Sequence, residues 1–319
     1  MSDDQALFAL LIRCFTIFNI CFDAPTILII IKFTPKNMNS MAYYLLLILG
    51  WNLLVNALFC FGHPYPVDSV DCFSLGGPLS GLGQSELIGH IWLGTILFAA
   101  ANCAAGIFMT YHYRYMAIKR IKTNEEPDQK SVIIYFVCLH LAISGLFIWT
   151  YWMSILSVDS YPFPDDSILR NDLFCYVPYG SKMLFLSVFL VTVFGLTSVC
   201  LSIFVALSLY ELNKNAHIIS EQTARIQRKY IWNLIIFSVF PLVSGGIPLM
   251  LLSISFMLPD TESHYMRIVC MIVLLDYGPF LCVFCFVRLR PYRSVLKRGF
   301  RKVKVIVGKS VVESSTHVE

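Results

Sequence analysis

Residues 104–122 read AAGIFMTYHYRYMAIKRIK, and within this stretch the sequence changes from apolar to basic residues. An apolar run ends at Tyr113-Arg114-Tyr115, and the residues that follow are basic. Lysine and arginine gather on the cytoplasmic side of membrane proteins. The stretch therefore predicts the cytoplasmic end of a membrane helix, the third along the chain, with Arg114 facing the cell interior.

The composition is that of an integral membrane protein. The 319 residues are 57% hydrophobic and only 14% charged, whereas about a quarter of the residues of a soluble domain are charged. A membrane span needs roughly 20 mostly apolar residues, and the chain has several such runs. Despite the net charge of +4, this hydropathy excludes a basic nucleic-acid-binding protein.

Seven apolar runs can each cross a bilayer as a helix that satisfies its own backbone groups. They occupy residues 7–31, 41–61, 87–111, 132–156, 184–209, 230–257 and 268–287. The predicted fold is an all-α membrane protein, a seven-transmembrane-helix bundle over residues 1–288. The first run is too long for the apolar part of a signal peptide, so we expect it to act as its own insertion signal.

The distribution of positive charge predicts the orientation. The segments 32–40, 112–131, 210–229 and the tail from Arg288 hold 2, 5, 4 and 9 lysines or arginines, so that 20 of the 24 lie on one side. The segments on the other side are acidic. The positive-inside rule then predicts an extracellular N-terminus, a cytoplasmic C-terminus and a multi-pass protein of the plasma membrane.

The two longer outer segments are rich in Gly, Pro, Ser and Asp, which predicts irregular loops. Each carries one cysteine, Cys72 or Cys175. Because the extracellular side is oxidising, a bridge between them is favoured over two free thiols, and it would tie the second outer loop over the mouth of the bundle. The other cysteines lie in or beside apolar runs without metal-ligand spacing, so no metal site is expected.

The tail is predicted to have two parts. In residues 289–304, apolar residues recur at three- and four-residue spacing among basic ones. This pattern predicts a short amphipathic helix on the anionic inner leaflet of the membrane. Residues 305–319 are predicted to be disordered.

Three polar residues lie at similar depth within the spans: Asp23, Asn52 and Asp276. Counted from the inner ends at the rise of a helix, they lie roughly 12 to 16 Å from the cytoplasmic boundary. A buried acid needs a partner, and two nearby carboxylates would share a proton, a water cluster or a cation. We interpret the three as a polar switch. For Asp23, a local hydrogen bond beside Pro25 is the alternative.

Two further features concern the inside of the bundle. Pro241 predicts a kink in the sixth span, and packing variation is the alternative, because Pro is common in membrane helices. A ligand would occupy an apolar cavity among the outer halves of the spans. Asn102 is the candidate ligand contact, although a hydrogen bond between helices is the favoured role for it.

Four motifs on the predicted cytoplasmic side give the chain a family resemblance. They are Thr34-Pro35-Lys36-Asn37-Met38 with Tyr43-Tyr44-Leu45, Tyr113-Arg114-Tyr115, Ser220–Gln227 followed by Pro241, and Arg290-Pro291-Tyr292-Arg293. Their order resembles that of nematode seven-transmembrane chemoreceptors of the str superfamily, nearest to the str, srh and sri classes. Two departures are Asp276-Tyr277-Gly278-Pro279, where the str class often has Asp-Pro, and the absence of an acidic residue before Arg114.

The resemblance implies a G-protein-coupled receptor for a small environmental molecule, in the cilium of a sensory neuron. It also implies that Tyr113, Arg114 and Tyr115 contact a heterotrimeric G protein, and that no cofactor is needed. A small membrane transporter is the alternative, but the internal repeats typical of transporters are not visible. An enzyme ranks last, because no catalytic motif is present.

Overall fold

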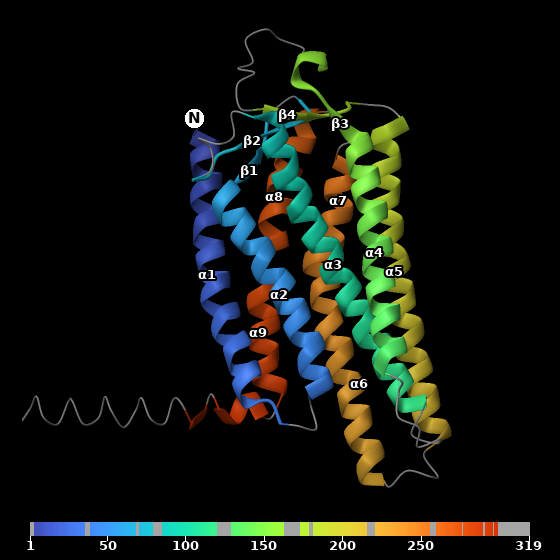
Figure 1. Ribbon diagram of the computed structural model, residues 1–319. Helices are drawn as coiled ribbons and strands as arrows, with labels where there is room; N and C mark the ends of the chain where they lie inside the picture. Colours follow the sequence, from blue (N-terminus) through green and yellow to red (C-terminus); the bar gives the residue numbers. More distant parts are fainter. Residues whose placement is uncertain are drawn as a thin grey trace, which may run out of the picture.

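The computed structural model is a bundle of long helices with a small sheet at one end (Figure 1). It describes residues 3–35, 39–67, 70–78, 85–119, 129–162, 173–178, 181–215, 221–255, 260–275, 277–289, 291–295 and 297–298. The helices are α1 (Asp3–Phe33), α2 (Asn39–Gly62), α3 (Glu86–Lys119), α4 (Gln129–Ser154), α5 (Ser181–Lys214), α6 (Glu221–Pro241), α7 (Ile247–Ser255), α8 (Asp260–Leu275) and α9 (Tyr277–Arg288).

These helices form seven membrane-crossing rods, as predicted. Six of the described helical stretches are long and apolar enough to cross a membrane, and a shorter apolar helix covers Val243–Ser255. α6 runs into α7 through a π-helix at Leu242–Gly246, so the three make one rod. α8 and α9 follow each other along another rod, and residue 276 between them lies outside the described residues. The seven-transmembrane bundle is therefore confirmed.

α3 passes obliquely through the middle of the bundle, between α2 and the pair α4 and α5 (Figure 1). One apolar cluster joins α3 to α1, α2, α5 and α9, and includes Ile48, Tyr111 and Cys285. A second cluster lies nearer the sheet and includes Phe59, Leu93 and Met271. Large apolar side chains on the outer face of α4, such as Trp152, are exposed, as expected of a surface that faces lipid.

The expectation of irregular outer loops is wrong in part, because the described segments of these loops form a sheet. Its strands are β1 (Pro64–Pro66), β2 (Cys72–Leu75), β3 (Ile155–Leu156) and β4 (Leu173–Tyr176), paired antiparallel in the order β1-β2-β4-β3. Two prolines are tolerated in β1 because it is an edge strand, where a missing N–H leaves no partner unpaired. We call this sheet the roof.

Successive residues of a strand point to opposite faces of the sheet. In the roof, both faces carry apolar residues. Phe73 of β2 and Phe174 of β4 are paired and their rings stack on the face toward the bundle, with centroids 5.9 Å apart. On the other face, Cys72 stands directly opposite Cys175, and the two form a disulfide. The bridge therefore joins the first outer loop to the second, within the roof itself.

A buried ion pair ties the roof to the helices below. Arg267 of α8 donates through Nη2 to Asp71 Oδ1 at 2.8 Å, and the two side chains are only 2% and 3% exposed. The same guanidinium donates to the carbonyls of Val70 at 3.4 Å and of Ser255, the last residue of α7, at 3.3 Å. Asp71 directly precedes β2, so one side chain connects the roof to both α7 and α8.

At the opposite end, the chain after α9 turns back against the bundle. Residues Pro291–Val295 are helical, and Tyr292 is buried with its hydroxyl 2.9 Å from Thr34 Oγ. Two of the family motifs thus touch each other. The rest of the predicted amphipathic helix to residue 304 is described only at Lys297 and Arg298, and the predicted disordered tail 305–319 lies outside the described residues.

We expect Asp71→Asn to lower the melting temperature of the purified receptor, because it leaves the buried Arg267 charge without its carboxylate. Breaking a buried ion pair costs about 3 to 5 kcal/mol. The matched control is Glu221→Gln, which breaks the ion pair with Arg225, whose side chains are 89% and 82% exposed. Exposed pairs contribute roughly 0 to 1 kcal/mol. Equal melting temperatures for the two variants would contradict the role given to Asp71.

Candidate functional site

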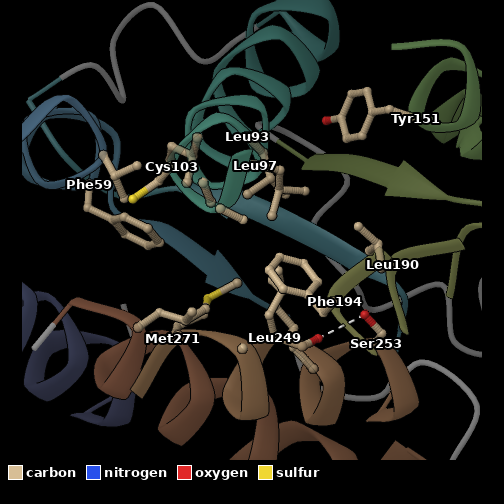
Figure 2. Close-up of a pocket in the computed structure, with 18 of the residues that line it drawn as sticks. Phe59, Leu93, Leu97, Cys103, Tyr151, Leu190, Phe194, Leu249, Ser253 and Met271 are labelled. Atoms are coloured by element: carbon tan, nitrogen blue, oxygen red, sulfur yellow. Dashed lines mark hydrogen bonds between the residues drawn. The ribbon is translucent and has the colours of Figure 1, made fainter. Parts of the chain in front are cut away.

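A cavity of about 120 Å³ lies under the roof, between α2, α3, α5, α7 and α8. Figure 2 shows side chains from these helices converging on one space. Its walls are mostly apolar and include Phe59, Leu93, Leu97, Phe194, Leu249 and Met271. Among the described residues, no charged side chain lines it. The cavity suits an uncharged molecule about as large as a six-membered ring, since roughly 150 Å³ holds benzene.

The π-helix forms part of the cavity wall through Gly245 and Gly246. It begins directly after Pro241, the residue predicted to kink the sixth span. Proline has no N–H to donate to the preceding turn, and a π-turn is one way for a helix to absorb such a defect. A Cβ built on Gly245 would meet no protein atom within 4 Å. The irregular turn therefore borders open space.

A tyrosine of the roof pairs with a tyrosine of α4. The hydroxyls of Tyr151, on α4, and Tyr176, on β4, lie 2.7 Å apart, and both residues line the cavity. Tyr151 also donates to the carbonyl of His90 at 2.7 Å. Burial raises the pKa of Tyr176 well above its ordinary value, and the neighbouring Tyr151 adds to this shift. Tyr176 is therefore a neutral phenol at any physiological pH.

Asn52 also lines the cavity and reaches the predicted polar switch. Its Nδ2 donates to Asp23 Oδ2 at 2.6 Å, and Cys282 Sγ donates to Asp23 Oδ1 at 3.1 Å. Asp23 is fully buried. The structure thus brings two of the three predicted residues together, from α1 and α2, with α9 against them. The third, Asp276, lies outside the described residues.

The candidate G-protein residues lie at the end of α3 away from the roof. The Tyr113 ring packs on Tyr44 of α2 at 5.1 Å between centroids, and the Tyr115 ring packs on Phe204 of α5 at 5.9 Å. Arg114, between them, is half-buried. The helix continues past this motif to Lys119.

Asn102, the candidate ligand contact, faces α4 instead of the cavity. His140 Nδ1 donates to Asn102 Oδ1 at 2.6 Å, and Asn102 Nδ2 lies 3.4 Å from Ser144 Oγ. Asn102 is not among the residues that line the cavity. Its contacts join α3 to α4, in keeping with the role favoured from sequence.

Comparison with known protein families identifies the chain's class. A family model described as "Serpentine type 7TM GPCR chemoreceptor Srh" matches residues 3–302. The chain belongs to this family. The str-superfamily resemblance predicted from the motifs is therefore confirmed, and the class is Srh. A search of curated proteins finds no match to the chain.

Family membership gives the geometry of this Srh chemoreceptor a context. Its cavity lies under the roof, and the Tyr113-Arg114-Tyr115 motif lies at the far end of the same central helix. No pattern in the sequence points specifically to the most distinctive polar lining, the Tyr151 and Tyr176 pair. Only the position of Tyr176, next to Cys175 in an outer loop, hints that it lies near the mouth of the bundle.

We expect Gly278→Ala to disturb the polar pair. A Cβ on Gly278 of α9 would lie 2.2 Å from Asn52 Nδ2 and 3.0 Å from Asp23 Oδ2. Overpacking of this kind costs about 1 to 3 kcal/mol, so the melting temperature of the purified receptor should fall. Gly145→Ala on α4 is the matched control, because a Cβ there meets no atom within 4 Å. An unchanged melting temperature for Gly278→Ala would show that the pair tolerates separation.

Proposed function

We propose that this Srh chemoreceptor binds a small, uncharged, largely apolar environmental molecule in the cavity and activates a heterotrimeric G protein at the other end of the bundle. The observation that carries the proposal is the cavity itself. It is apolar, it lies under a covalently linked roof, and its wall includes the π-helix of the sixth rod.

The sixth rod offers a mechanical route from ligand to G protein. Its π-turn touches the cavity, while its inner half is held by an apolar cluster of Ile231 with Ile118 of α3 and Leu212 of α5. Arg228 Nη2 of α6 also donates to Asn213 Oδ1 of α5 at 3.0 Å. A ligand that binds better to a different geometry of the π-turn would favour that receptor conformation. In it, the inner half of the sixth rod would move away from this cluster.

The polar switch offers a second route. Asn52 lines the cavity and donates a hydrogen bond to Asp23. The two bonded side chains lie against Gly278, at the start of α9. A ligand that moves Asn52 would therefore alter the contact among α1, α2 and α9. We include Asp276 in this switch on the depth argument alone.

The coupling surface is assigned to Tyr113, Arg114 and Tyr115. The two aromatic rings pack α3 against α2 and α5, and Arg114 carries the charge of the motif. We also propose that the N-terminus is extracellular, because described basic residues such as Lys119, Lys214 and Arg288 lie at the helix ends opposite the roof (Figure 1). The family resemblance adds a sensory-neuron cilium as the location.

The cavity is tested by filling it. A screen of volatile and small apolar molecules, with a calcium readout in cells that express a promiscuous G protein, should yield activators. Ala104→Phe should abolish the response to them, because Ala104 lines the cavity and a phenyl group would occupy it. Ala142→Phe, on the exposed face of α4, is the control and should respond normally. An activator that ignores both substitutions would place the binding site elsewhere.

Coupling is tested with Arg114→Ala. We expect signalling to be lost while surface expression and ligand binding persist, because the substitution removes a charge at the inner end and no part of the cavity. Arg225→Ala, at an 82% exposed position on α6, is the matched control. Normal signalling by Arg114→Ala would reduce Arg114 to an anchor at the lipid headgroups.

Orientation is tested by antibody access. An epitope added before residue 1 should stain intact cells, since the acidic segments and the roof are expected outside. An epitope after residue 319 should stain only permeabilised cells. The reverse result would invert the topology and place the cavity mouth in the cytoplasm.

A further inference from the structure

The hydroxyl and thiol groups that line the cavity share one property: their hydrogens are already used. Four hydroxyls and one thiol belong to described lining residues, which are Tyr151, Tyr176, Ser187, Ser253 and Cys103. Hydroxyl groups both donate and accept, whereas a carbonyl only accepts. Tracing each hydrogen therefore tells which kind of ligand group the cavity can satisfy.

The tyrosine pair has a defined direction. Tyr151 has a single hydroxyl hydrogen, and the contact with the His90 carbonyl at 2.7 Å requires it, because the carbonyl cannot donate. Tyr176 must then supply the hydrogen in the 2.7 Å contact between the two hydroxyls. Both hydrogens are spent within the protein, and the Tyr176 oxygen receives no hydrogen in return from Tyr151.

The remaining lining groups behave in the same way. Ser187 Oγ donates to the carbonyl of Ser253 at 3.0 Å, and Ser253 Oγ donates to the carbonyl of Leu249 at 2.8 Å. Cys103 Sγ donates to the carbonyl of Ile48 at 3.9 Å. One of the two Asn52 Nδ2 hydrogens goes to Asp23, and the nitrogen lies close to Gly278. These side chains can accept hydrogen bonds from a ligand, but their hydroxyl and thiol hydrogens are not open to it.

We propose that the cavity selects hydrogen-bond donors. It takes small neutral alcohols, phenols and N–H heteroaromatics in preference to ketones, aldehydes and esters of the same skeleton, and the Tyr176 hydroxyl oxygen is the acceptor. This selectivity rests on the proposed function of the cavity as the ligand site, and it adds the chemical class of the ligand.

The physical reason is the cost of an unmet hydrogen bond. Both kinds of probe give up the hydrogen bonds that water donates to their oxygen, and the hydroxyls and thiol of the cavity offer no hydrogen in return. The alcohol donates its own hydrogen to the Tyr176 oxygen, whereas a bound carbonyl compound leaves that oxygen without a hydrogen. A buried polar atom left unsatisfied weakens binding, and we expect the alcohol to bind about tenfold more tightly than the matched aldehyde, which corresponds to about 1.4 kcal/mol.

The test uses matched sets of probes on the full-length receptor in nanodiscs. One set is benzyl alcohol, benzaldehyde and ethylbenzene, which have the same number of heavy atoms. A second set has the corresponding cyclohexyl skeleton. The rise in melting temperature with free probe concentration gives an apparent Kd for each. We expect the alcohol to bind about tenfold more tightly than the aldehyde in each set that binds.

Tyr151→Phe gives the decisive comparison. It removes the acceptor of the Tyr176 hydrogen, which then becomes available to a ligand. The preference for alcohol over aldehyde should fall to about parity or reverse, and the affinity for the aldehyde should rise. Tyr176→Phe should weaken alcohol binding and leave the hydrocarbon unchanged. Tyr265→Phe, 64% exposed on α8, should change none of these values.

The outcomes separate this inference from the proposed function. Probes that bind the wild type and fail to bind Ala104→Phe support the cavity as the ligand site. If aldehydes bind such a receptor as tightly as alcohols, or if Tyr151→Phe leaves the ratio unchanged, the donor selectivity is wrong and the proposed function stands. If no probe stabilises the wild-type receptor, or Ala104→Phe binds them equally well, the cavity is not the site and both proposals fall.

Discussion

The ion pair between Asp71 and Arg267 is the interaction on which the upper half of the molecule depends. Removing two charges from water is repaid only when geometry and additional hydrogen bonds are favourable. Here the guanidinium also reaches two carbonyls, of Val70 and of Ser255, so one side chain connects the roof with the ends of α7 and α8. The pair and the disulfide restrain the roof from two sides, and this holds Tyr176 in register over the cavity.

Below the roof, the cavity borders the less regular parts of the bundle. Its wall contains the π-turn that follows Pro241, and its lining includes Asn52, which is bonded to Asp23. The cavity thus lies between a roof held by a disulfide and a buried ion pair and a wall that contains an irregular helical turn.

Much of the fold follows from the sequence because lipid imposes strict conditions on it. Hydropathy reveals the seven rods, since each must satisfy its own backbone in the membrane. The depth of each residue along its helix was enough to predict that Asp23 lies near Asn52. The roof escaped prediction because its strands are two to four residues long, too short for an alternating pattern to stand out. Strand β2 also pairs with β4, about a hundred residues away.

The functional site was harder to foresee than the fold for a related reason. Asp71 and Arg267 look like ordinary charges of outer segments, and only their three-dimensional position shows that both are buried. Tyr151 is one aromatic among many in an apolar run. Its importance comes from a single hydroxyl contact with Tyr176, which no periodicity encodes. Asn102 was a candidate by polarity alone, and its partner His140 lies on another helix.

The connection between Cys72 and Cys175 has a consequence for biosynthesis. The two cysteines are 103 residues apart, and α3 and α4 lie between them. The ribosome must therefore translate both helices, and the membrane must receive them, before the second thiol can reach the first. β4 also lies between β2 and β3 in the sheet and pairs with both. A nascent chain therefore cannot form the bridge until Cys175, just before the fifth helix, has been synthesised.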